Sequence, residues 1–282
     1  MERLSEIKVL PILESLTYIK QNHASVVRFG DGEVDLMTGH SIPYQKYDDK
    51  LAKKLKQILQ TKSDENLLVC LPDVFSNMER YNKNARVFWE GHFLKYSNFY
   101  IDNCNSPFYG STFISRPYID LVDKSVSGTY FASLKELWKG KDILIVEGAT
   151  SRSGVGNDLF ADASSIKRII CPSKNAFQYY DEIFQEIEKH AKDRLMLIML
   201  GPTAKVLVSD LTSQGYQAID LGHIDSEYEW YEMGATYKVK LANKHTAEFN
   251  HDEGIELELD QKYQQQIIAR IGVDNFNEIL VK

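Results

Sequence analysis

Apolar residues along this chain alternate between helical and strand-like spacing. Apolar positions three or four apart predict amphipathic helices at residues 10–21 and 49–59. Short aliphatic runs between them predict buried strands at residues 25–29 and 66–71, and Pro72 ends the second strand. After residue 142 the pattern becomes regular, with strands at 143–147, 166–171, 195–200 and 217–221 and helices at 174–190 and 203–214. Apolar strands alternating with helices indicate an α/β fold with a Rossmann-like, mostly parallel sheet and helices on both faces.

The segment from residue 77 to 130 is less regular and rich in aromatic side chains. Helical spacing is visible at residues 84–96, and Arg116-Pro117 marks a break. No repeat, low-complexity tract or linker is apparent. We therefore expect residues 1–282 to form a single domain, with this irregular segment in its middle.

Composition narrows the class of protein. The chain has 282 residues with a hydrophobic share of 43%, as expected for a globular fold with a substantial core. Its formal net charge of -7 argues against a nucleic-acid partner. The N-terminus has no apolar signal core, and no run approaches the ~20 apolar residues of a membrane span, so we expect a cytosolic protein.

The three cysteines, Cys70, Cys104 and Cys171, are far apart in the sequence, which suits reduced thiols.

The first candidate site follows the strand at residues 25–29. There the chain reads Gly30-Asp31-Gly32-Glu33. In an extended segment, side chains two apart point the same way, so Asp31 and Glu33 are able to offer two oxygens to one hard cation such as Mg²⁺ or Mn²⁺. The alternative is an Asp-Gly turn with a solvated glutamate.

The loops after later strands contain residues suited to phosphate binding. Residues 148–158 are rich in glycine and hydroxyl groups and include Arg152, but match neither the dinucleotide fingerprint nor the P-loop. A flexible connection is the alternative. Polar loops also begin at Pro172 and Gly201, and Thr203 is able to cap the helix that follows. Ligands of such sheets bind at the carboxyl ends of the strands, so these loops predict a nucleotide-sized cleft.

Acidic and histidine side chains gather near the end of the chain. The segment 221–230 contains His223, Asp225, Glu227 and Glu229, which suit general-base or metal-ligand chemistry, although alternating acids also occur on a solvated face. Further on, His245 and Glu248 are three residues apart, so on a helical turn they lie on one side and are able to share a ligand. The alternative is a surface pair.

In this order, six motifs resemble one known family over nearly the whole chain. They are Arg28-Phe-Gly-Asp-Gly-Glu33, Ile145-Val-Glu-Gly148, Ser151-Arg-Ser-Gly-Val-Gly-Asn-Asp-Leu-Phe160, Cys171-Pro-Ser-Lys-Asn-Ala-Phe177, Leu200-Gly-Pro-Thr-Ala-Lys205 and Gly222-His-Ile-Asp-Ser-Glu-Tyr-Glu-Trp230. The chain thereby resembles the bacterial glycosyltransferases of the GT-D fold, once described as a domain of unknown function in Gram-positive glycosylation loci.

The resemblance implies a reaction and a set of ligands. A hexose, usually glucose, would move from a UDP-sugar to an acceptor glycan on a glycoprotein or cell-surface polysaccharide. Mn²⁺, or Mg²⁺, would lie between the diphosphate and the metal ligands Asp31, Glu33, His245 and Glu248. The donor would contact residues of the strand-end loops: Arg28, Gly30, Arg152, Gly154, Gly156, Asn157, Asp158, Pro172, Asn175, Gly201 and Pro202.

The transfer would also need charge stabilisation and, if it inverts the sugar, a base. Arg28 and Arg152 are the candidate arginines for the charge that develops on UDP; the alternative for Arg28 is a structural pair with an acid. We rank Asp225, then Glu227, then His223 as the base, because their loop is expected to face the sugar.

Other questions stay open at this level. Aromatic residues of the middle segment would stack on acceptor sugars or pack in the core, and we expect core packing for most of them: Trp89, Tyr96, Phe99, Tyr100, Phe108, Tyr109 and Phe113. A homodimer is left open. The alternative functions are a nicotinamide-dependent oxidoreductase, which should show the dinucleotide fingerprint, and a non-catalytic nucleotide-binding module.

Overall fold

The computed structural model describes residues 4–246, 249, 254–256 and 260–273. These residues contain an eight-stranded sheet with the order β3-β2-β1-β7-β6-β4-β5-β8, and all its neighbouring strands are parallel. The mostly parallel α/β sheet predicted from the sequence is therefore confirmed. Its strands are β1 (Ser25–Arg28), β2 (Leu67–Leu71), β3 (Gly110–Ser111), β4 (Asp142–Gly148), β5 (Ser165–Cys171), β6 (Leu195–Met199), β7 (Ala218–Asp220) and β8 (Ile267–Arg270).

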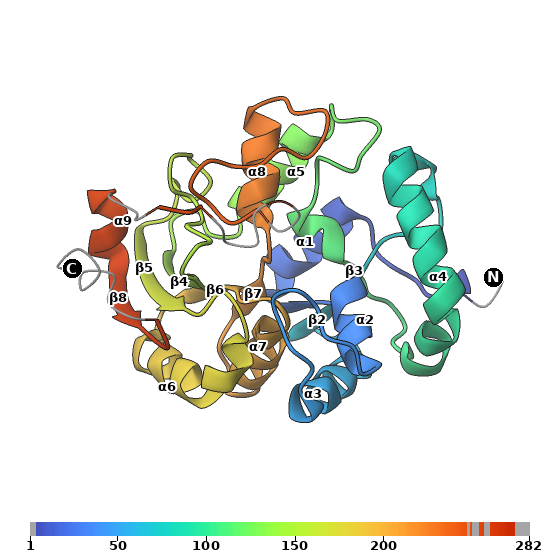
Figure 1. The fold of residues 1–282 in the computed structure, drawn as a ribbon, viewed down its shortest axis with the longest axis horizontal. Helices are drawn as coiled ribbons and strands as arrows, with labels where there is room; N and C mark the ends of the chain where they lie inside the picture. Colours follow the sequence, from blue (N-terminus) through green and yellow to red (C-terminus); the bar gives the residue numbers. More distant parts are fainter. Residues whose placement is uncertain (1–3, 247–248, 250–253, 257–259, 274–282) are drawn as a thin grey trace.

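Helices lie on both faces of this sheet. They are α1 (Ile12–Asn22), α2 (Asp31–Met37), α3 (Asp49–Leu59), α4 (Lys83–Asn103), α5 (Ser127–Lys135), α6 (Tyr180–His190), α7 (Pro202–Ser213), α8 (Ile224–Glu232) and α9 (Gln261–Gln266), with short 3₁₀ turns at Met78–Arg80, Thr112–Ser115 and Ala176–Tyr179. In Figure 1, α3, α6 and α7 lie below the sheet, α1, α5 and α8 lie above it, and α4 stands beyond its β3 edge. No helix of the described residues is long and apolar enough to cross a membrane.

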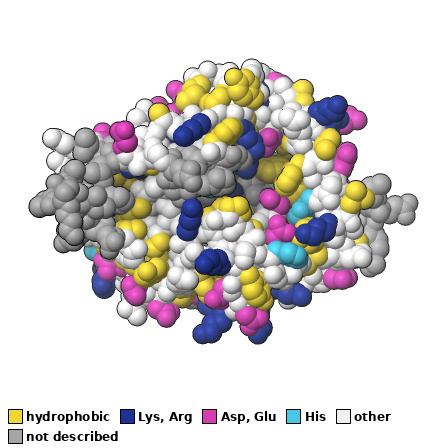
Figure 2. Space-filling model, viewed as in Figure 1, with side chains coloured by type: hydrophobic (Ala, Val, Ile, Leu, Met, Phe, Trp, Pro, Cys, Tyr) yellow, Lys and Arg dark blue, Asp and Glu magenta, His cyan; other side chains and the backbone are white. Residues whose placement is uncertain are grey.

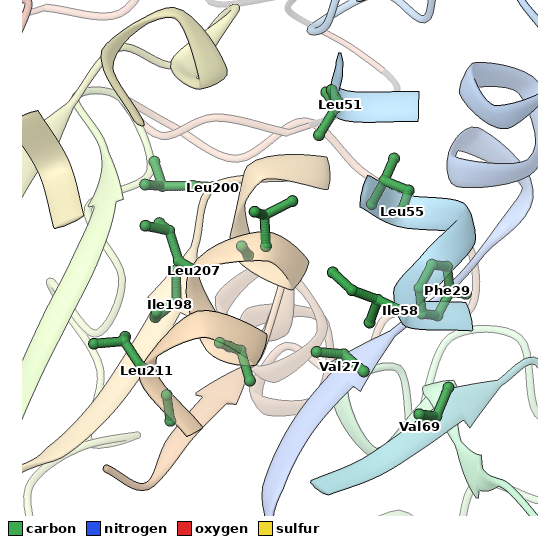
Figure 3. Close-up of a cluster of buried hydrophobic side chains, with 14 of the residues drawn as sticks. Val27, Phe29, Leu51, Leu55, Ile58, Val69, Ile198, Leu200, Leu207 and Leu211 are labelled. Atoms are coloured by element: carbon green, nitrogen blue, oxygen red, sulfur yellow. The ribbon is translucent and has the colours of Figure 1, made fainter. Parts of the chain in front are cut away.

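Two hydrophobic cores hold these layers together. Val27 of β1 points into the lower core, which also contains Leu55 of α3 and Leu207 of α7 (Figure 3). Its neighbour Val26 points into the upper core, which also contains Leu134 of α5. Successive side chains of a strand point to opposite faces, so strands buried on both faces are mostly apolar. This burial explains why continuous apolar runs identified the strands.

The structure corrects the prediction for the residues that follow β1. The extended strand ends at Arg28, and Asp31 and Glu33 occupy the first turn of α2. The Glu33 side chain accepts a hydrogen bond from the backbone N–H of Gly30 at 2.8 Å, which caps the helix. Side chains two apart on a helix do not face each other, so the strand geometry expected for this pair is wrong.

Other differences concern the ends and edges of elements. Helix α4 runs to Asn103, beyond the predicted end at residue 96, and the sheet gains the edge strands β3 and β8. The aromatic residues of the middle segment pack as expected: Trp89, Tyr96, Tyr100, Tyr109 and Phe113 are buried, and Phe99 and Phe108 pack against the cores. The three cysteines are free thiols, as predicted.

Candidate functional site

A cavity of about 910 Å³ opens at the carboxyl ends of the strands. Residues that immediately follow strands line it, among them Pro72 after β2, Pro172 after β5 and Gly222 after β7. In the sheet, β2 and β3 lie on one side of β1, and the strands from β4 to β8 lie on its other side. The order of the strands therefore changes direction beside β1. Open α/β sheets bind ligands at such a point. The cavity therefore lies where the sheet topology places a ligand site.

Buried charges join the strands and helices at the base of this cavity. The guanidinium of Arg28 donates hydrogen bonds to Asp220, with Nε 2.7 Å from the carbonyl oxygen and Nη2 3.1 Å from Oδ1. The other oxygen of Asp220 lies 3.1 Å from Nζ of Lys205, and that ammonium lies 2.9 Å from Oε1 of Glu33. Arg28, Asp220, Lys205 and Glu33 are all buried. We call these four residues the buried charge chain.

Within the predicted metal pair, the structure gives the two carboxylates different surroundings. Both oxygens of Glu33 already have partners, the Gly30 N–H and the Lys205 ammonium. Asp31 instead lies exposed on the cavity wall. Although the side chain is exposed, the cavity walls around it reduce its contact with water, and this desolvation is the first cause of its raised pKa; the negative charge of Glu33 is the second. Asp31 is thus the member of the pair that a ligand in the cavity is able to reach.

Two histidines and an arginine are among the further ionisable groups that line the same cavity. The rings of His223 and His245 stack with centroids 5.5 Å apart, and Tyr44 meets His223 edge-on at 6.3 Å. Arg116 also lines the cavity, and its positive charge acts on Asp31 by lowering the pKa of that carboxyl. The cavity therefore combines the Asp31 carboxylate with an arginine and two histidines.

The glycine-rich loop after β4 is held mainly by α8. The backbone N–H of Gly154 and the amide of Asn157 both donate to Oδ1 of Asp225, at 2.7 and 2.9 Å. Nζ of Lys244 lies 2.9 Å from the other oxygen of Asp225. The start of this loop, at Gly148 and Ser151, lines the cavity. Its later residues fix the loop to α8 and lie away from the cavity wall.

Arg152 also binds protein groups. Its guanidinium donates to the carbonyl oxygen of Asn243 at 2.8 Å and to that of Glu256. The side chain is buried and does not line the cavity. Arg152 therefore connects the loop after β4 to the segment beyond α8.

The two acids ranked first as the base lie behind the cavity wall. Asp225 is buried and bonded to Gly154, Asn157 and Lys244 as described above, and burial raises its pKa. Glu227 accepts a hydrogen bond from the N–H of Ile119 at 3.1 Å and lies 3.6 Å from Nε of Arg116. Burial raises the pKa of Glu227 to about 7. Neither acid lines the cavity, so the expectation that this segment presents them to the sugar does not fit the structure; His223 does line it.

The predicted site residues divide into two groups by position. Those that line the cavity are Arg28, Gly30, Asp31, Glu33, Pro172, Gly201, Pro202, His223 and His245. Those that lie outside its lining are Arg152, Gly154, Gly156, Asn157, Asp158, Asn175, Asp225 and Glu227. Glu248 lies outside the described residues. Within the described part of the chain, no group of three or more histidine, cysteine or acidic side chains comes together as a metal cluster.

Sequence reasoning missed several residues of the site. Lys205 stood at the end of a recognised motif, yet its partners Glu33 and Asp220 are distant in sequence. Asp220 lies in an apolar strand, where a lone acid was a signal for a buried ion pair.

Asn175, which was predicted to contact the donor, has an indirect role, because its N–H and side chain bind Tyr44 and Lys46 and hold the Tyr44 segment at the cavity. For Arg116 the sequence shows only a break in the pattern, at Arg116-Pro117.

Known proteins resemble this chain closely. The family model described as glycosyltransferase GT-D fold matches residues 26–249. The chain is 57% identical over 267 residues to a probable glycosyl transferase of Streptococcus gordonii and 55% identical over 268 residues to the glycosyltransferase GlyD of Streptococcus pneumoniae. Each match covers 95% of this chain but only 39% and 33% of the respective relative. The chain thus spans less than half the length of these relatives.

Solved structures share the fold along their whole length. One, described as a highly conserved domain of unknown function 1792 with a distinct glycosyltransferase fold, has 82% identity and a TM-score of 0.95, and the match covers 96% of this chain and 98% of that one. Another, described as a new glycosyltransferase from Streptococcus sanguinis, has 59% identity and a TM-score of 0.93 over 94% of this chain and 99% of that one.

Proposed function

The chain belongs to the GT-D glycosyltransferase family, and from this premise we propose that it transfers a hexose, with glucose favoured, from a UDP-sugar to an acceptor glycan. The observation that carries the proposal is the cavity at the strand ends, with Asp31 and Arg116 on its wall. Its volume of about 910 Å³ is in the range that small-molecule sites occupy. A glycan on a glycoprotein or a cell-surface polysaccharide is the acceptor class that we assign.

A divalent cation, Mn²⁺ or Mg²⁺, fits the groups on the cavity wall. Such ions are commonly held by one or two carboxylates together with substrate phosphates, and Asp31 supplies an accessible carboxylate. The bound ion would supply charge stabilisation for the departing diphosphate. His245 lines the same cavity and is the second protein ligand that we propose. Glu33 would act through the buried charge chain, which fixes the first turn of α2 and hence Asp31.

The protein's own cations have separate roles. Cleavage of the sugar–diphosphate bond leaves additional negative charge on UDP, and a positioned guanidinium lowers the energy of that charge. Arg116 lines the cavity and is the arginine that we assign to this task. The guanidinium of Arg28 is occupied by Asp220, Thr112 and Ser115, so its role is to position β1 and β7.

A transfer with inversion requires a group that accepts the proton of the acceptor hydroxyl. His223 is our choice, because it lines the cavity whereas Asp225 and Glu227 do not. An imidazole changes charge close to neutral pH, which suits a general base. The edge-on contact with Tyr44 and the stacking on His245 orient the ring toward the cavity.

The experiment that tests this function measures UDP release and sugar transfer from a set of donors. The purified protein is incubated with Mn²⁺, with a panel of glycan acceptors and with UDP-glucose, UDP-galactose or UDP-N-acetylglucosamine, and both UDP and the glycosylated acceptor are quantified. We expect release to be fastest from UDP-glucose and to be abolished in Asp31→Asn. A separate calorimetric titration with NAD addresses the oxidoreductase alternative. UDP binding without any release from all three donors would favour the non-catalytic nucleotide-binding module and contradict the proposal.

A further inference from the structure

The cavity continues beyond the strand ends to a wall that carries exposed aromatic side chains. Phe88 of α4 and Tyr237, which follows α8, both line it. Phe88 is 51% exposed and Tyr237 is 71% exposed, whereas most aromatic residues of the middle segment are buried. In Figure 2, hydrophobic side chains gather over α8 and the segment that follows it. Sequence reasoning had selected neither residue.

The ring of Phe88 is held in place by its neighbours. It meets the ring of Trp89 edge-on with centroids 5.2 Å apart and stacks on His92 at 6.4 Å with an interplanar angle of 17°. Trp89 is itself buried and packs edge-on against Phe113. A ring fixed in this way loses little conformational freedom when a ligand covers its exposed part.

Polar side chains line the same cavity as these two aromatic rings. Asn84 and Thr236 lie close in sequence to Phe88 and Tyr237 respectively, and all four residues line the cavity together with Asp120. One face of a pyranose ring presents C–H groups, while its edge presents hydroxyl groups. Aromatic rings cover the C–H face, and amide, hydroxyl and carboxylate groups bind the edge. The composition of this wall therefore suits a saccharide better than a purely apolar ligand.

We propose that Phe88 and Tyr237 form the acceptor subsite and bind a pyranose of the acceptor glycan by stacking. The inference rests on the proposed function, since a transferase must hold its acceptor in the same cavity as its donor. All five residues line one cavity: we assign Asp31, Arg116 and His223 to the donor and Phe88 and Tyr237 to the acceptor. The acceptor class is thus a glycan whose terminal sugar exposes an apolar face.

The test measures saccharide binding separately from donor binding. The probes are the p-nitrophenyl β-glycosides of glucose, galactose and N-acetylglucosamine, and saturation-transfer NMR and calorimetry record their binding in the presence of UDP and Mn²⁺. We expect at least one probe to bind the unaltered protein. We expect Phe88→Ala and Tyr237→Ala each to weaken that binding by about tenfold, and Phe88→Tyr to retain it.

A matched control comes from the same helix. Leu94 of α4 is 89% exposed and does not line the cavity, so Leu94→Ala should bind the probe as the unaltered protein does. The affinity for UDP should be unchanged in all four variants, which separates failure of this inference from failure of the proposed function. Absence of binding by every probe, or undiminished binding in both alanine variants, would overturn the acceptor subsite.

Discussion

Glu33 of α2 and Lys205 of α7 form a buried ion pair, with Oε1 and Nζ 2.9 Å apart. The same ammonium lies 3.1 Å from Asp220 of β7, which in turn binds Arg28 of β1. The pair thereby connects the first turn of α2, where Asp31 lies, to the central strands of the sheet. We infer that this connection sets the position of Asp31 in the cavity.

Removal of the central ammonium should destabilise the fold. Lys205→Met leaves the carboxylates of Glu33 and Asp220 buried without their shared cation, and breaking a buried ion pair from one side costs about 3–5 kcal/mol. Urea denaturation should therefore show a loss of this size. Lys54→Met provides the control, because that lysine is 42% exposed in its ion pair with Asp210. Equal losses in the two variants would contradict the role of the buried charge chain.

The two acids of the Asp-x-Glu motif should behave differently. Asp31→Asn removes an exposed carboxylate, so the free energy of unfolding should change by no more than about 0.5 kcal/mol. Glu33→Gln weakens both the cap of α2 and the ion pair with Lys205 and should cost about 1–3 kcal/mol. Thermal and urea unfolding measure both values. If Asp31→Asn proved the more destabilising change, the assignment of the two carboxylates would be reversed.

Gly222 should tolerate no side chain. A Cβ atom there would lie 2.0 Å from Nη2 of Arg28, and the residue has a φ of +49°. Gly222→Ala should lower the free energy of unfolding by at least about 2 kcal/mol more than a glycine-to-alanine change that adds only backbone strain. Gly156→Ala is the matched control, because Gly156 has a φ of +79° with nothing within 4 Å of its Cβ position. Calorimetric unfolding compares the two, and equal losses would show that the Arg28 contact has no energetic effect.

Glu227 should make the stability depend on pH. Its pKa is about 7 in the folded protein against an ordinary value of 4.5, so the folded state keeps a proton that the unfolded state releases between these values. The contribution to stability therefore falls as the pH rises through this window, by about 3 kcal/mol in total. Glu227→Gln removes the titration, so the variant should gain stability relative to the unaltered protein between pH 5 and pH 8. Urea denaturation at both pH values, with the exposed Glu232→Gln as control, measures this gain. If the difference in stability between Glu227→Gln and the unaltered protein were the same at pH 5 and at pH 8, the prediction would be contradicted.

The alternation of strands and helices was predictable because it depends on local apolar spacing. Strands β4 and β6 are buried on both faces, which leaves continuous apolar runs at residues 143–146 and 195–199 in the sequence. Helix α2 was not predictable in this way, because Gly30-Asp31-Gly32 is typical of a turn. Its cap depends on the Glu33 side chain folding back onto the Gly30 N–H.

The site was predictable only in part, for a related reason. Parallel topology places strand ends together, so Asp31, Gly201 and His223 were correctly expected near one cleft. The side chain of Arg152 binds the backbone carbonyl of Asn243, and that of Asp225 binds Lys244. Both partners lie in another segment of the chain. Arg28 and Asp220 are 192 residues apart. No local pattern indicates which charged residues will bind one another and which will face a ligand.

The measurement that tests the central claim most directly is a calorimetric titration of the protein with UDP, with and without Mn²⁺. The claim is that the donor binds at the strand ends through a cation held by Asp31. The unaltered protein should bind UDP in the presence of Mn²⁺, and exhaustive chelation should weaken this binding at least about tenfold. Asp31→Asn should show the weak binding under both conditions, and Mg²⁺ should restore less affinity than Mn²⁺ if His245 is a ligand. Equal UDP affinity in the chelated protein, the Mn²⁺ form and Asp31→Asn would contradict the account.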